Sequence, residues 1–194
     1  MNIYQNTITK EAVAALPKEN FEGKITIVSD EKTLGKVLAA LEKETVVGFD
    51  TETRPAFAKG SRNQVALMQI ATQNRCYLLR LCKMGFPAAL LDFLASPDIK
   101  KIGLSLKDDF HVLRYRHSFQ PNHFIDLQNI IKNYGIEELS LQKIYAIIFN
   151  KKISKTQRLT NWEAEELTRA QQEYAALDAW ACLKIYQELQ TLNS

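Results

Sequence analysis

The chain has 194 residues, of which 46% are hydrophobic and 24% are charged, and its formal net charge is +3. This composition is typical of a folded domain with one hydrophobic core, and the length excludes two large cores. The three cysteines form no Cys-x-x-Cys pair, which argues against a disulfide framework or a zinc site. No apolar run reaches the roughly 18 residues of a membrane span, and the start lacks a signal-peptide core. We therefore expect a soluble, cytoplasmic protein with one domain over residues 1–194 and no membrane contact.

The hydrophobic pattern predicts alternating strands and helices. Strands are expected at 24–29, 45–52, 64–72, 75–81, 100–105 and 123–128. Helices are expected at 31–43, 87–96, 106–116 and about 163–191, with Asp126 capping the helix that follows it. Residues 151–161 are the one long irregular segment. This arrangement predicts an α/β fold with one mixed sheet flanked by helices.

The strand at 45–52 ends in two acids. Side chains alternate across a strand, so Asp50 and Glu52 point to the same face and Thr51 to the other. One interpretation is a strand that emerges into solvent. The other is a pair of metal ligands, because hard divalent cations prefer carboxylate oxygen. The strand alone leaves both open.

A third acid lies on an apolar stripe of the last helix. At about 100° per residue, Tyr174, Asp178, Ile185 and Leu189 share one face. A buried carboxylate without a partner costs several kcal/mol, so a cation is expected to compensate for Asp178. Tyr174 lies one turn earlier on the same face. It is either a core tyrosine or a residue that orients a water.

A fourth acid is expected from the helix at 106–116. Leu106, Phe110 and Leu113 define its buried face, with Asp109 at the edge of that face and Asp108 toward solvent. Periodicity therefore favours Asp109 over Asp108 for chemistry, although both could be surface acids. Acids from three segments fit one cluster, which is unstable without cations. Two divalent ions in such a cluster are typical of phosphodiester hydrolysis.

Three stretches resemble the motifs of the DEDD superfamily of 3′–5′ exonucleases: FDTET (49–53), GLSLKDDFHVL (103–113) and YAALDAWACLKIY (174–186). The last has the Tyr-x-x-x-Asp form of the DEDDy branch. Two further stretches, VALMQIATQNRCYLLRL and NWEAEELTRAQQEYAALDA, are most similar to the Werner syndrome exonuclease domain and, more distantly, to ribonuclease D. The resemblance covers about residues 25–190.

The resemblance implies a ribonuclease H-like fold and two divalent ions, Mg²⁺ or Mn²⁺. It implies that Asp50 bridges both ions, that Glu52 and Asp178 complete the first site, and that Asp109 holds the second. Tyr174 would position or activate the attacking water. Ser105 stands where polymerase proofreading domains commonly have Asn, which argues against a proofreading role.

The segment KKISKTQR (151–158) has four positive charges and no acid. It is either a solvated loop or a contact for phosphates. We expect Lys155 and Arg158 to contact the nucleic-acid backbone, and Trp162 to be a packing anchor. The Thr51 backbone and Met68 are expected to line the pocket for the terminal nucleotide. A weaker prediction puts Arg54, Lys59 and Arg62 on the opposite wall.

The sequence therefore predicts a metal-dependent 3′–5′ exonuclease that acts on a nucleic acid with a free 3′ end and releases nucleoside 5′-monophosphates. The alternatives are a catalytically silent nucleic-acid-binding module on the same fold and a small-molecule phosphohydrolase. The pattern does not choose between DNA and RNA, and it does not predict an oligomeric state.

Overall fold

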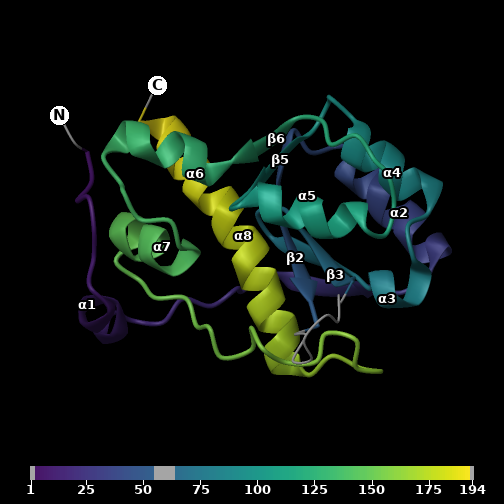
Figure 1. Cartoon of the computed structure of the whole chain (residues 1–194), viewed down its shortest axis with the longest axis horizontal. Helices are drawn as coiled ribbons and strands as arrows, with labels where there is room; N and C mark the ends of the chain where they lie inside the picture. The colour runs from purple at the N-terminus through teal and green to yellow at the C-terminus, as the bar shows by residue number, and fades with distance from the viewer. Residues whose placement is uncertain (1–2, 55–63, 193–194) are drawn as a thin grey trace.

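The computed structural model describes residues 3–54 and 64–192. Six strands form one mixed sheet in the order β1-β4-β3-β2-β5-β6 (Figure 1). Their bounds are Lys24–Val28 (β1), Val46–Thr53 (β2), Val65–Ala71 (β3), Arg75–Leu79 (β4), Lys100–Gly103 (β5) and Phe124–Asp126 (β6). β2–β3 and β3–β4 are antiparallel pairs. β1–β4, β2–β5 and β5–β6 are parallel pairs. The predicted mixed sheet is confirmed.

Helices cover both faces of the sheet. They are α1 (Lys10–Ala15), α2 (Glu31–Leu41), α3 (Leu81–Met84), α4 (Ala88–Ala95), α5 (Leu106–Arg114), α6 (Leu127–Ile130), the 3₁₀ helix η1 (Ile131–Tyr134), α7 (Leu141–Phe149) and α8 (Arg169–Thr191). One layer of core side chains joins the sheet to α7 and α8, and the other joins it to α2, α4 and α5. Figure 1 shows α8 crossing the sheet diagonally. Within the described ranges, no helix is both long enough and apolar enough to cross a membrane.

The last helix begins later than predicted. It starts at Arg169 rather than near residue 163, because Thr168 and Gln171 form a capping box that ends the preceding turns. The guanidinium of Arg80 donates to the backbone carbonyls of Ala164 and Glu165, which holds these residues in turns instead of a helix. Asp126 caps α6, as predicted, by accepting from the Gln128 amide.

An N-terminal arm, residues 3–23, runs along α7 and α8 before the first strand (Figure 1). It includes α1, which the sequence pattern did not predict. Glu19 of the arm is 6% exposed and accepts from the Tyr145 hydroxyl of α7 and the Lys184 ammonium of α8. The arm is therefore fixed to two helices by a buried carboxylate that has cationic and hydroxyl partners.

Candidate metal centre

α8 lies directly on β2 at Gly48. A Cβ at this position would meet the Ala179 carbonyl oxygen at 2.0 Å, closer than any real Cβ contact. Because side chains alternate along a strand, Asp50 and Glu52 face α8 as Gly48 does. Asp178 precedes Ala179, so the close approach at Gly48 brings Asp178 beside the two acids of β2.

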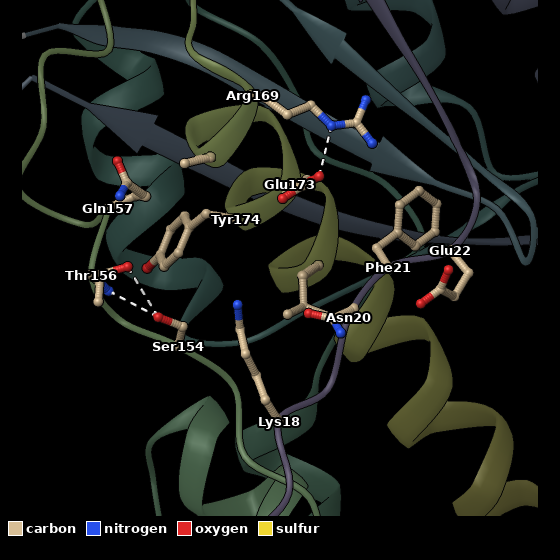
Figure 2. A pocket seen from close by; sticks show the side chains of 12 residues that line it. Lys18, Asn20, Phe21, Glu22, Ser154, Thr156, Gln157, Arg169, Glu173 and Tyr174 are labelled. Carbon is tan, nitrogen blue, oxygen red and sulfur yellow. Dashed lines mark hydrogen bonds and ion pairs between the residues drawn. The ribbon is translucent and has the colours of Figure 1, made fainter.

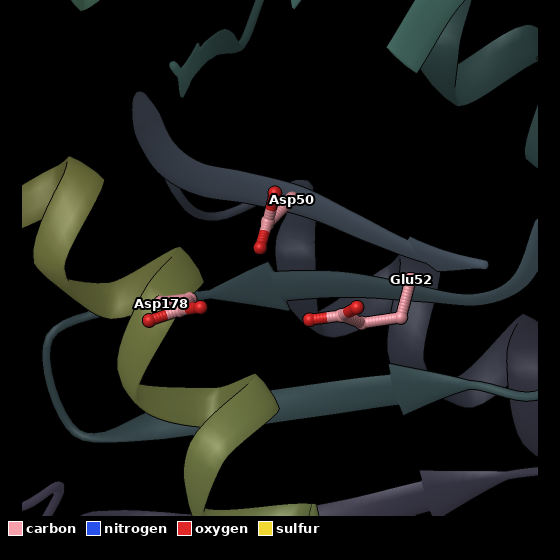
Figure 3. Close-up of side chains that lie close together, drawn as sticks. All are labelled: Asp50, Glu52 and Asp178. Carbon is pink, nitrogen blue, oxygen red and sulfur yellow. The ribbon is translucent and has the colours of Figure 1, made fainter. Parts of the chain in front are cut away.

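Three carboxylates meet between β2 and α8 (Figure 3). One oxygen each from Asp50, Glu52 and Asp178 lies within 4.8 Å of the others. Glu52 is 8% exposed and Asp178 is 6% exposed. The Oδ1 atom of Asp178 is buried and has no hydrogen-bond partner in the described parts of the chain. An orphaned carboxylate oxygen among other acids is a candidate ligand for a cation.

Burial and mutual repulsion disfavour the charged forms of these acids. Burial, and then the charge of Asp178, raise the pKa of Asp50 well above its usual value. Burial, followed by the charges of Asp50 and Asp178, raises the pKa of Glu52 to about 10. Burial raises the pKa of Asp178 to about 7, although Tyr174 and Lys155 act in the opposite direction. A divalent cation would reverse this balance by stabilising the ionised carboxylates.

Asp109 reaches the same region from α5. The Thr51 hydroxyl of β2 donates to its Oδ1 at 2.5 Å. Burial, and then the charge of Asp50, raise the pKa of Asp109 well above its usual value. Asp108 is exposed and accepts from the Ser105 hydroxyl at 2.8 Å. The structure thus puts Asp109 near Asp50 and Asp108 in solvent, as periodicity indicated, while the role of Asp109 as a metal ligand stays a prediction.

Tyr174 lies beside Asp178 on α8 and is 7% exposed. Burial, and then the charge of Asp178, raise the pKa of its hydroxyl, which stays protonated. Trp162 packs against the Tyr174 ring with centroids 6.0 Å apart and is fully buried. Trp162 is therefore the packing anchor that the sequence predicted, and it holds Tyr174 in place.

Lys155 and Arg158, the cations expected to contact the nucleic-acid backbone, are both exposed. The charge of Lys155 acts on Asp178, and that of Arg158 acts on Glu52. Arg54 pairs with Glu163 at 3.4 Å. Lys59 and Arg62, predicted for the opposite wall, lie outside the described residues.

The prediction for Met68 is wrong. Met68 pairs with Thr51 in the β2–β3 ladder, and its side chain is fully buried in the layer under α2 and α4. It therefore has no surface to offer a nucleotide. The Thr51 side chain is engaged with Asp109, so the role of its backbone as a pocket wall stays a prediction.

Sequence reasoning missed Gln69. It pairs with Asp50 across β2 and β3, so the two side chains share the face under α8. Gln69 is fully buried, and neither its Nε2 nor its Oε1 has a hydrogen-bond partner among the described residues. An amide inside an apolar strand was the available signal. Its position gives the acid cluster an adjacent neutral hydrogen-bonding group.

These donors fit a hard divalent cation. All candidate ligands are carboxylates, which suit Mg²⁺ and Mn²⁺. The three cysteines are free, and two of them are buried, so they offer no competing thiolate site here. The residues that would hold an ion are Asp50, Glu52 and Asp178, whereas the role of Asp109 at a second ion stays a prediction.

Comparison with known proteins agrees with this geometry. The 3′-5′ exonuclease family profile matches residues 25–192. The mouse bifunctional 3′-5′ exonuclease/ATP-dependent helicase WRN is 34% identical over 154 residues, which are 76% of this chain and 11% of that protein. The chain thus spans a small part of this relative.

Two solved structures have the same fold. The Nibbler EXO domain of Aedes aegypti superposes with a TM-score of 0.80 at 22% identity, covering 89% of this chain and 91% of that one. Escherichia coli RNase D superposes with a TM-score of 0.78 at 22% identity, covering 87% of this chain and 44% of that one. The predicted ribonuclease H-like fold and the predicted likeness to the Werner and ribonuclease D proteins are confirmed.

Proposed function

Because the chain belongs to the 3′–5′ exonuclease family, we propose that it is an active, metal-dependent exonuclease that removes nucleoside 5′-monophosphates from the 3′ end of DNA or RNA. The observation that carries the proposal is the carboxylate cluster of Asp50, Glu52 and Asp178. Three acids with oxygens within 4.8 Å of one another, two of them buried and Asp50 half-buried, destabilise a fold that binds no cation there. A silent binding module would gain nothing from keeping them.

The proposed metal set is the DEDDy one. Asp50 would contact both ions, with Glu52 and Asp178 on the first and Asp109 on the second. When bound, two such metal ions lower the pKa of a water molecule and stabilise charge on the attacking and leaving oxygens. The four carboxylates would hold the ions, and the Thr51 hydroxyl fixes the carboxylate of Asp109 by donating to it.

Tyr174 would position the attacking water. Its hydroxyl stays protonated, lies next to Asp178, and is held from behind by Trp162. A protonated phenol can donate to a water or to a phosphate oxygen while the carboxylate accepts. Lys155 and Arg158 would contact the phosphates next to the cleaved bond, since the charge of Lys155 acts on Asp178 and that of Arg158 acts on Glu52.

The test uses 5′-labelled DNA and RNA oligonucleotides with Mg²⁺ or Mn²⁺. We expect a descending ladder that disappears with chelator, with Asp50→Asn and with Asp109→Asn. Asp108→Asn is the matched control, because it removes the same charge from the adjacent, exposed position and should keep the ladder. Binding without cleavage by the wild type would establish the silent module. Hydrolysis of free nucleotides with intact oligonucleotides would establish the phosphohydrolase.

A further inference from the structure

The N-terminal arm precedes the region that matches the exonuclease family, which starts at residue 25. It is nonetheless bonded to the basic segment beside the acid cluster. The Lys152 amide donates to the Pro17 carbonyl, and the Glu19 amide donates to the Lys152 carbonyl, both at 2.9 Å. The Glu19 carboxylate also accepts from the Lys151 ammonium at 3.0 Å. The arm thus determines where the segment 151–158 lies.

A cavity of about 300 Å³ opens between the arm, residues 154–157 and the first turns of α8 (Figure 2). Lys18 and Asn20 of the arm line one side, and Ser154, Thr156 and Gln157 line the other. Figure 2 shows the Lys18 ammonium directed into the space in front of Tyr174. These groups include an ammonium, amides and hydroxyls, which are donors that suit a phosphate and a sugar.

The two acids that line the cavity do not neutralise the charge of Lys18. Glu173 pairs with Arg169 at 2.6 Å, so this acid is neutralised at the rim. Figure 2 shows Glu22 at the opposite end from Ser154 and Thr156. Lys18 lines the cavity and forms no ion pair in the described part of the chain, so its charge stays uncompensated there.

Tyr174 connects the cavity to the acid cluster. Its side chain lines the cavity, while its hydroxyl interacts with Asp178. Residues 154–158 border both spaces: Ser154 and Thr156 line the cavity, and the charges of Lys155 and Arg158 act on the carboxylates. A strand whose last phosphodiester lies at the acids can therefore continue into the cavity.

More cations extend the surface beyond the cavity. Burial lowers the pKa of Lys155, followed by the nearby charges of Arg158, Lys10 and Lys143. Lys143 is paired with Glu138 at 2.8 Å. No ion pair involves Lys10, Lys18 or Lys155 in the described part of the chain, and all three are exposed. Unpaired cations that gather in this way are typical of a surface for a polyanion.

We propose that the N-terminal arm forms the second wall of the nucleic-acid track, with Lys18 and Lys10 contacting backbone phosphates on the 5′ side of the terminal nucleotide and the cavity holding one sugar-phosphate unit. The proposal rests on the proposed function for the position of the 3′ end. It assigns a binding role to residues that lie outside the family match. Single strands long enough to pass the acid cluster should gain affinity from the arm, and dinucleotides should not reach Lys10.

The test compares two double variants of the full chain. Lys10→Gln with Lys18→Gln removes the arm charges. Lys32→Gln with Lys36→Gln is the matched control, because it removes two exposed lysines from α2, which covers the other face of the sheet. Fluorescence anisotropy with labelled single strands of two, four, eight and sixteen nucleotides is measured in chelator over a range of salt concentrations, so that binding is read without cleavage.

The arm variant should bind the sixteen-nucleotide strand about ten-fold more weakly than the wild type. The slope of the logarithm of the binding constant against the logarithm of the salt concentration should become less steep by about 1.4, because each phosphate contact on a single strand contributes about 0.7 to it. The control should match the wild type at every length. Equal slopes for the arm and control variants would overturn the inference, even if the wild type cleaves oligonucleotides. An inactive wild type would refute the proposed function, and the comparison of slopes would still decide the role of the arm.

Discussion

Replacing Gly48 with Ala should separate the two halves of the acid cluster. The new Cβ would lie 2.0 Å from the Ala179 carbonyl oxygen, and even a tight contact requires 3.0 Å. α8 must therefore retreat from β2 by roughly 1 Å, and Asp178 moves with it. A misplacement of about 1 Å in a catalytic site can cost about 100-fold in rate. Overpacking of this kind costs about 1–3 kcal/mol of stability.

Two measurements follow the Gly48→Ala protein: the exonuclease rate, and the increase in melting temperature when Mn²⁺ is added. Both should fall sharply while the circular dichroism spectrum stays native. Gly35→Ala is the control, because nothing lies within 4 Å of its added Cβ on α2 and alanine favours a helix by about 1 kcal/mol. A Gly48→Ala protein with a wild-type rate and a full response to Mn²⁺ would refute the close-packing explanation.

Three further predictions concern the same region. Since burial raises the pKa of Asp178 to about 7 and that of Glu52 to about 10, the metal-free protein should lose stability as pH rises from about 4, near the ordinary pKa of both acids in the unfolded chain, toward these raised values. Melting curves in chelator test this, and a melting temperature that rises between pH 5 and 8 contradicts it. Tyr174→Phe should lower kcat by about 100-fold while the Mn²⁺-induced shift in melting temperature persists, and an unchanged kcat would exclude a role in positioning water. Tyr145→Phe should reduce the free energy of unfolding in urea by about 1–3 kcal/mol, because the buried Glu19 loses a 2.7 Å hydrogen bond; an unchanged value would mean that Lys151 and Lys184 suffice.

Helical periodicity was sufficient to predict a site residue where a carboxylate lies on or beside an otherwise apolar face. Asp178 stood out because it is the one carboxylate on the apolar stripe of its helix. The structure buries it beside Asp50. The choice between Asp108 and Asp109 depended on their rotation about a short helix, and the structure agrees with it. Local geometry determines both of these features.

Features that depend on contacts between distant segments were not predictable in this way. Every residue of β3 is buried, so no alternation indicated that Met68 faces α2 and α4 while Gln69 faces α8. A helix was expected from about residue 163, but Arg80 donates to the carbonyls of Ala164 and Glu165, and α8 begins only at Arg169. The sequence signal for this later start is the capping box of Thr168 and Gln171.

Glu19 has a practical consequence for anyone who shortens this chain. A fragment trimmed to the family match at residue 25 would lack the carboxylate that accepts from Tyr145, Lys151 and Lys184. The Tyr145 hydroxyl and the ammonium groups of Lys151 and Lys184 would then lie close together without an acid. The family match begins after residues that form buried contacts with α7 and α8, so an expression fragment should begin before α1.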